Sequence, residues 1–193
     1  KKPEVWLTID DGPTAATTLA MLDLLDHHGA KATFFLVGQR AAAHPGLVTE
    51  ICRRGHGIGN HTQTHPLGAF WLAGPARTGD EVNACQAVLR STGAPTPTWF
   101  RPPAGIKTFF LRSVLARHGM ILVGWSARAR EHWSTSIDAP LRRLKRKIRP
   151  GAILLVHESN THGAQRVALL SALLDHLVSS GYACVLPKRD DLR

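Results

Sequence analysis

Long apolar runs, paired cysteines and internal repeats are all missing from this chain of 193 residues. The longest apolar stretches, 120–123 and 153–156, are far shorter than the roughly 20 residues that a membrane-spanning helix needs. No secretory signal pattern is visible at the start of the sequence. Cys52, Cys85 and Cys184 are few, odd in number and widely spaced. They indicate neither a disulfide framework nor a thiolate metal site, and they leave the compartment open.

Acidic residues are also scarce, because 14 Asp and Glu stand against 24 Lys and Arg, for a formal net charge of +10. This excess favours anionic surfaces such as cell-wall polymers, phospholipid headgroups or nucleic acid, and it does not choose among them. Much of it lies in residues 142–149. Leu141, Leu144 and Ile148 repeat there at helical spacing, so the basic residues fill the rest of the helix circumference. The segment is either a solvated helix face or a docking surface for an anionic polymer or a membrane.

The remaining composition, with 44% hydrophobic and 20% charged residues, is typical of a globular protein, and the length suits one domain over 1–193. Short apolar runs alternate with segments of helical periodicity, such as Leu19, Leu22 and Leu25. This alternation predicts an α/β fold with a largely parallel sheet. Seven strands are predicted, at 5–9, 32–37, 56–59, 98–101, 120–124, 153–156 and 183–186. The irregular stretch 66–75 is predicted to be a loop beside a ligand groove.

Polar side chains follow four of the predicted strands at the point where each strand ends. The carboxyl ends of parallel strands meet at one edge of a sheet, where α/β proteins build their sites. One such ending is easily explained as a helix cap, whereas four together indicate a functional site. The side chains are Asp10 and Asp11 after the first strand, His61 and His65 after the third, Arg101 after the fourth and His157 after the sixth.

Two adjacent carboxylates at a strand end need a cationic partner, and a divalent metal supplies one. His61 and His65 are four residues apart, so they share a face if the segment is helical. Together with one of the two carboxylates they make a three-ligand set with a position left for water, which is typical of catalytic zinc. Cobalt or nickel also suits such a set. The simpler interpretation, a capping Asp and two surface histidines, explains each motif alone but not their joint occurrence.

Arg101 and His157 complete this set. A guanidinium beside two prolines at a strand end needs a carboxylate partner, and Asp10 is the nearest candidate. His157 directly follows an apolar strand, so its imidazole is predicted at the rim of the sheet. That position suits a general acid.

These residues resemble the motifs of the NodB-like polysaccharide deacetylases, also called carbohydrate esterase family 4. The likeness extends from Val5 to Leu186 and rests on four segments in combination. They are LTIDDGP at 7–13, NHTQTH at 60–65, FRPPAG at 100–105 and LLVH at 154–157.

The resemblance implies a fold, a reaction and a set of roles. The fold is a distorted (β/α) barrel of about seven parallel strands. The reaction is metal-dependent removal of acetyl groups from N-acetylglucosamine-type sugars of a cell-wall or surface polysaccharide. We expect a monomeric, extracytoplasmic enzyme without a specific nucleic-acid partner. The implied roles are catalysis by Asp10, Arg101 and His157, metal binding by Asp11, His61 and His65, and substrate binding by Pro103, Ala104, Trp125 and Leu155.

Two departures from the family pattern affect the substrate groove. Ala104 stands where the family usually has an aromatic residue, so a side-chain contact to the sugar is lost although a backbone donor remains. Arg128 stands where the family commonly has an Asp. Either Glu131 supplies the missing negative charge, or Arg128 faces an acidic group of the substrate. Trp125 either walls the site or is a buried structural residue.

Two other functions remain compatible with the sequence. The same clan includes hydrolases of non-sugar amides, and a fold does not fix the substrate. A carbohydrate-binding protein without turnover is the alternative from a different class. The intact set of acid, base and metal ligands disfavours a pure binder, because binding alone requires none of them.

Overall fold

The structure is a computed structural model that describes residues 2–67, 70–131, 134 and 136–188. Strands and helices alternate along most of the chain. The strands are β1 Glu4–Gly12, β2 Ala32–Leu36, β3 Gly57–Asn60, β4 Trp99–Phe100, β5 Ile121–Leu122, β6 Ala127–Arg128, β7 Ile153–His157 and β8 Ala183–Cys184. The helices are α1 Thr18–His27, α2 Gly38–Ala43, α3 Pro45–Arg53, α4 Pro75–Ser91, α5 Leu111–Arg117, α6 Asp138–Lys145 and α7 Gly163–Ser179, with short 3₁₀ turns at Phe70–Leu72 and Pro103–Gly105.

The strands form one sheet in the order β5-β4-β3-β2-β1-β7-β6, and β8 pairs with the beginning of β1. Every pairing along this path is parallel. Within the described residues, β5 and β6 form the two edges of the path and do not pair with each other, so the barrel is incomplete. The predicted α/β fold, a distorted barrel of about seven parallel strands, is confirmed.

The alternation of side chains along β1 separates the core from the site. Val5, Leu7 and Ile9 point to one face, where they join the main apolar cluster with residues of α1 and α7. Trp6 joins a smaller cluster on the other face. Asp10 lies four residues after Trp6 on the same face of the strand, and it is 2% exposed. The strand therefore anchors its apolar half in the core and presents a carboxylate at its carboxyl end.

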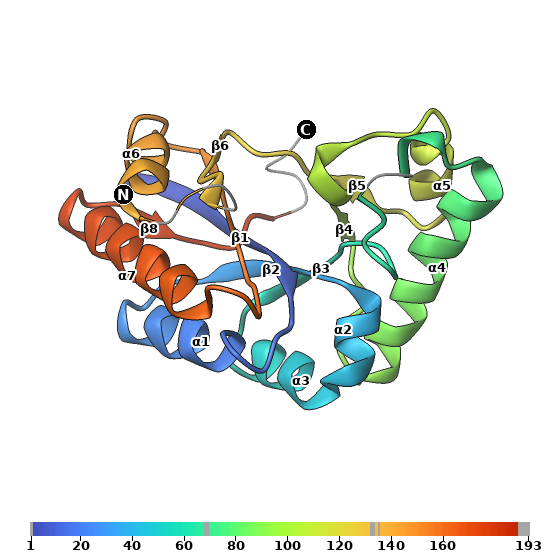
Figure 1. The fold of residues 1–193 in the computed structure, drawn as a ribbon, viewed down its shortest axis with the longest axis horizontal. Coiled ribbons are helices and arrows are strands. Elements are labelled where there is room, and N and C mark those ends of the chain that lie inside the picture. The colour runs from blue at the N-terminus through green and yellow to red at the C-terminus, as the bar shows by residue number, and fades with distance from the viewer. Residues whose placement is uncertain (1, 68–69, 132–133, 135, 189–193) are drawn as a thin grey trace.

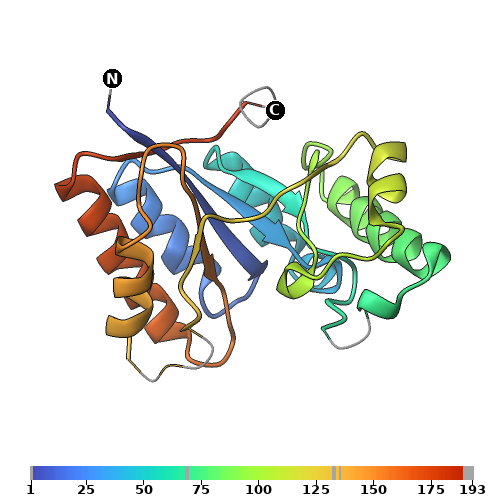
Figure 2. The same ribbon diagram turned by 90° about the horizontal axis from the view of Figure 1, so that it is seen from above.

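Two groups of helices flank the sheet. Helices α1, α6 and α7 lie on one side, and α4 and α5 lie near β4 and β5 (Figure 1). The view turned by 90° shows the long central strands between these two groups (Figure 2). A second apolar cluster, which includes Phe70, Val82, Phe100 and Leu115, fixes α4 and α5 against the sheet. No helix in the described part of the chain is long and apolar enough to cross a membrane.

The seven predicted strands are all present. The differences from the prediction concern one additional strand and details of two helices. The two-residue strand β6 was not predicted, because Ala127 and Arg128 are too short a run to carry a periodicity. Leu19 was expected on the buried face of α1, but it is 46% exposed, since Met21 joins Leu22 and Leu25 in the core instead. In the basic segment 142–149, α6 ends at Lys145, before the predicted helical repeat reaches Ile148.

Candidate active site

Arg101 and Asp10 form a buried ion pair beneath the pocket. Arg101 Nη1 lies 2.7 Å from Asp10 Oδ1, and the two side chains are 0% and 3% exposed. The guanidinium also donates to Thr8 Oγ1 and to two main-chain carbonyls, and it packs 4.2 Å from the centre of the Phe35 ring. The predicted pairing of Arg101 with Asp10 is therefore confirmed. Because Oδ1 faces the arginine, Oδ2 of Asp10 is the carboxylate oxygen that lies toward His61, at 3.8 Å from its Nε2.

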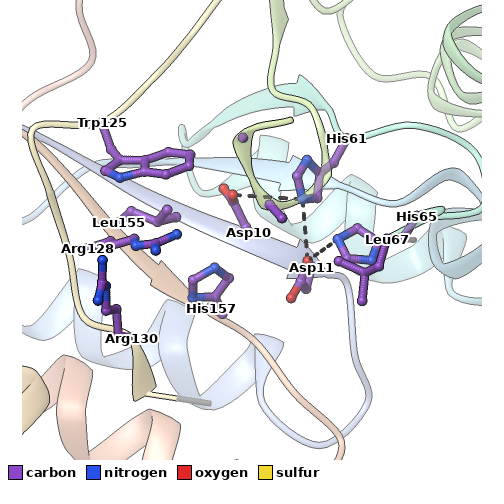
Figure 3. Close-up of a pocket in the computed structure, with 12 residues that line it drawn as sticks. Asp10, Asp11, His61, His65, Leu67, Trp125, Arg128, Arg130, Leu155 and His157 are labelled. Atoms are coloured by element: carbon purple, nitrogen blue, oxygen red, sulfur yellow. Dashed lines mark ion pairs between the residues drawn. The ribbon is translucent and has the colours of Figure 1, made fainter. Parts of the chain in front are cut away.

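Asp11, His61 and His65 direct their ligand atoms toward one point at the edge of the sheet (Figure 3). Asp11 Oδ1 lies 3.4 Å from His61 Nε2 and 3.1 Å from His65 Nε2. The three ligand atoms all lie within 4.8 Å of one another. Although burial by itself raises the pKa of Asp11, the two facing imidazoles outweigh it and hold that pKa well below its usual range.

The donor set fits a divalent metal. Among the described residues, Asp11 Oδ1 is a buried oxygen without a hydrogen-bond partner, which is costly unless a cation lies beside it. His61 Nδ1 lies 2.6 Å from the Arg101 carbonyl, which can only accept, so Nδ1 carries the proton and Nε2 keeps its lone pair. One carboxylate and two imidazoles form the ligand set of catalytic zinc, and they also suit cobalt or nickel.

The segment that carries the two histidines is not helical, so the conditional prediction that they share a helix face is wrong. Residues 61–66 form an irregular loop, in which Thr62 and His65 have positive φ angles of 70° and 54°. Side chains replace the helical hydrogen bonds. Asn60 Oδ1 accepts from the Thr62 N–H, and Glu81 accepts from the N–H groups of Gln63 and Thr64. The two Nε2 atoms converge through this loop.

Asp11 reaches the histidines because the backbone turns sharply after Asp10. The register between β1 and β2 shifts between Asp10 and Gly12, and Asp11 has a φ of 72°. The Arg40 guanidinium donates to the Asp11 carbonyl and holds this turn. A Cβ atom at Gly12 would collide with the buried carboxylate of Glu158, so only glycine fits there. The bulge turns the Asp11 side chain to the metal cluster while Asp10 keeps its contact with Arg101.

His157 is held by Glu131. The carboxylate oxygen Oε1 of Glu131 accepts from the His157 backbone N–H at 2.8 Å and lies 3.0 Å from Nδ1. Nδ1 therefore carries a proton, and Nε2 is the ring nitrogen that does not contact Glu131. Burial lowers the pKa of His157, as does the charge of Arg128. The negative charge that Glu131 supplies thus acts on His157.

The pocket around these groups has a volume of about 380 Å³. Nine of the predicted site residues line it, whereas Arg101 lies buried beneath Asp10, and Pro103 is buried in the turn behind the pocket wall. Ala104 has a φ of 53°, which brings it to the surface of that turn. Figure 3 places Trp125, Leu155, Arg128 and Arg130 on one side of the pocket and Asp11, His65 and Leu67 on the other.

Three lining residues were not predicted: Leu67, Gly105 and Arg130. Leu67 belongs to the stretch 66–75, for which we predicted a position beside a groove, while Gly68 of that stretch lies outside the described residues. Gly105 has no room for a Cβ because the Trp125 ring packs against it. Arg130 stands beyond the end of β6 and has a φ of 57°, which is not that of an extended strand, so strand alternation gave no signal for it.

Replacing Glu131 with Gln should lower kcat about tenfold without changing metal content. The amide still accepts a hydrogen bond from Nδ1, but hydrogen bonds to charged groups are stronger by about 1–2 kcal/mol, and about 1.4 kcal/mol corresponds to a factor of ten. The measurement compares kcat, metal content and melting temperature of E131Q with those of Asp175→Asn, a change at an exposed carboxylate on α7. An unchanged kcat in E131Q would show that Glu131 does not act through His157.

Comparison with known proteins places this chain in a family. The profile described as polysaccharide deacetylase matches residues 1–123. A chitooligosaccharide deacetylase of Bradyrhizobium sp. (strain ANU 289) is 36% identical over 163 residues, which cover 84% of this chain and 74% of that protein. A peptidoglycan-N-acetylglucosamine deacetylase of Bacillus cereus is 30% identical, over 94% of this chain and 84% of that protein.

Solved structures agree with the sequence matches. A family 4 carbohydrate esterase from Streptomyces lividans, in complex with acetate, superimposes with a TM-score of 0.86 and 31% sequence identity. The match covers 96% of this chain and 93% of that one. The chain therefore belongs to the polysaccharide deacetylase family, carbohydrate esterase family 4, and is a hydrolase of the class that cleaves N-acetyl amide bonds.

Proposed function

We propose that this enzyme removes acetyl groups from N-acetylglucosamine-type residues of a cell-wall or surface glycan, as one catalytic domain over 1–193. The observation that carries the proposal is the convergence of a three-ligand cluster, an Arg-paired carboxylate and a Glu-held histidine on one pocket. The peptidoglycan and chitooligosaccharide deacetylases among the relatives support this substrate class. An extracytoplasmic location follows, since such glycans lie outside the cytoplasm.

Asp10 is the proposed general base. Arg101 holds one carboxylate oxygen at 2.7 Å, while the second oxygen remains for a water molecule at the pocket. Asp11, His61 and His65 would hold a divalent metal, by default zinc, which would supply a Lewis acid for the acetamide carbonyl. Asp10 takes a proton from the attacking water, and the new C–O bond forms at the carbonyl carbon.

His157 is the proposed general acid. Its Nδ1 is fixed by Glu131, so Nε2 gives a proton to the sugar nitrogen as the C–N bond breaks. The Ala104 N–H is the proposed donor to the developing oxyanion, because the N–H groups of Gly105 and Ile106 already donate within the turn. The products are acetate and a free amino sugar.

Leu155 and Trp125 form the apolar side of the pocket, where the acetyl methyl group is proposed to lie. Leu155 is 2% exposed and stands on β7, two residues before His157. Alternate residues of a strand point to the same side, so the methyl pocket and the acid are placed by one strand. The aromatic residue that the family usually has at Ala104 is replaced by a smaller side chain, which leaves space for the sugar.

Acetate release from a substrate panel tests the proposal. The panel holds N-acetylglucosamine oligomers, peptidoglycan, the corresponding deacetylated oligomers and several non-sugar amides, each incubated with zinc-loaded enzyme. We expect acetate from the N-acetylated glycans alone. Hydrolysis of the non-sugar amides alone would assign the enzyme to another substrate class. Sugar binding without any release would favour a carbohydrate-binding protein.

A further inference from the structure

Two guanidinium groups in the pocket wall have no acidic partner among the residues that the structure describes. Arg128 is half-buried on β6, and Arg130 follows it with an exposed side chain. Both line the same pocket as the metal-ligand cluster. Within the described ranges, neither forms an ion pair or a side-chain hydrogen bond. The Arg128 guanidinium lies over the Trp125 ring, 5.5 Å from its centre.

The backbone directs both arginines into the pocket. Arg128 pairs with Leu155 across the β6 and β7 strands, so it stands beside the wall that carries His157. Arg130 lies two residues further along, beyond the end of the strand. Figure 3 shows the two guanidiniums next to each other, close to His157 and below Trp125. Their position is therefore on the substrate side of the pocket, opposite Asp11 and His65.

The charges that the pocket already contains do not require these arginines. Asp10 is paired with Arg101 at 2.7 Å, and Asp11 faces the two histidines. The Glu131 carboxylate contacts His157 and lies 3.7 Å from Arg166. A divalent metal adds further positive charge, and the amine product is a cation. Two additional guanidiniums would repel such a product, unless the substrate brings its own negative charge.

We propose that Arg128 and Arg130 bind an oxyanion of the substrate, so that the enzyme acts on N-acetyl sugars with a phosphate or carboxylate close to the acetamido group. The planar donor fork of arginine fits either anion in a bidentate manner. This inference rests on the proposed deacetylase function and narrows its substrate class.

The basic surface continues from these arginines to α6. Arg143 Nη1 lies 3.5 Å from the carbonyl of Ala129, the residue between the two pocket arginines. Arg142, Lys145 and Arg146 next to it are exposed. On this account, the basic segment attracts the same polyanionic substrate that the pocket arginines hold, which explains both features by one chemistry.

One neutral and two anionic substrates test the inference. The neutral arm is N-acetylglucosamine oligomers, and the two anionic arms are N-acetylglucosamine 1-phosphate and an oligomer with carboxylate-bearing sugars. The wild-type enzyme should prefer at least one anionic arm, and the phosphate and carboxylate arms distinguish the sources. Arg128→Gln should lower kcat/KM for the preferred anionic substrate about tenfold more than for the neutral one, because only the anionic substrate loses a charged hydrogen bond. The preference should also decrease with salt.

Arg117→Gln on α5, an exposed arginine outside the pocket, is the control for net charge. A wild-type preference for neutral sugars, or an equal loss on both classes in R128Q and Arg130→Gln, would overturn the inference while the deacetylase function stands. The absence of acetate from every sugar would contradict the deacetylase function itself. In that case calorimetric titration still decides the inference: N-acetylglucosamine 1-phosphate must bind more tightly than N-acetylglucosamine, and R128Q must remove the difference.

Discussion

Replacing Asp10 with Asn should lower kcat by about 10²- to 10⁴-fold, the range that a positioned general base contributes. Asn has almost the same shape as Asp and still accepts a hydrogen bond from Arg101, but it cannot take a proton from water. The metal ligands are untouched, so metal content should remain that of the wild type. The measurement is acetate release at saturating substrate, together with metal analysis of the purified D10N protein.

A loss of stability must be separated from a loss of catalysis in D10N. The variant leaves the Arg101 charge buried without its carboxylate partner, and such a change costs about 3–5 kcal/mol of folding free energy. Thr8→Val is the matched control, because it removes another buried acceptor of Arg101 without changing a reacting group. T8V should melt at a lower temperature and retain most of its activity. If D10N keeps wild-type activity, Asp10 is not the base.

Removing the metal or one of its ligands should lower activity by about 10³-fold or more, because a Lewis acid supplies several kcal/mol of transition-state stabilisation and about 1.4 kcal/mol corresponds to a factor of ten. His65→Ala is the variant of choice, since His65 is 16% exposed and His61 only 2%. Because His65 is less buried than His61, its replacement should destabilise the fold less. The measurement is metal stoichiometry and activity after dialysis against a chelator and after addition of zinc.

Zinc should restore the wild-type enzyme and not H65A. The activity that cobalt and nickel restore to the same metal-free protein, compared with that restored by zinc, ranks the metals that the site accepts. His118→Ala, a change at the end of α5, controls for the loss of a histidine as such. Full activity of the wild-type protein without bound metal would refute a metal-dependent reaction. Metal retention with full activity in H65A would exclude His65 as a ligand.

The charges in the pocket wall differ from the usual pattern of the family. The family's usual Asp is replaced by Arg128, and the sequence allowed either Glu131 or an acidic substrate to compensate. The structure shows that Glu131 contacts His157, 3.0 Å from Nδ1. Arg128 instead lines the pocket. The two alternatives are therefore not exclusive, since Glu131 contacts the histidine while Arg128 lines the pocket and is open to the proposed acidic group of the substrate.

The sequence by itself determined the alternation of strands and helices and the position of the polar residues at the strand ends. These features are local, because side-chain periodicity reports which face of a strand or helix is buried. The buried alternation of Val5, Leu7 and Ile9 could be read in this way, and Asp10 and Asp11 then fell at the site edge. The pairing of Arg101 with Asp10 also followed, since a buried charge needs a partner.

Only the tertiary structure decided the shape of the histidine loop and the partner of His157. The loop at 61–66 is held by Glu81, which lies 17 and 18 residues away along the chain, and His157 is held by Glu131, 26 residues away. No local pattern encodes such contacts, because they form only when α4 and the 127–131 segment pack against the sheet. The same packing, and not helical spacing, brought His61 and His65 to a single carboxylate oxygen of Asp11.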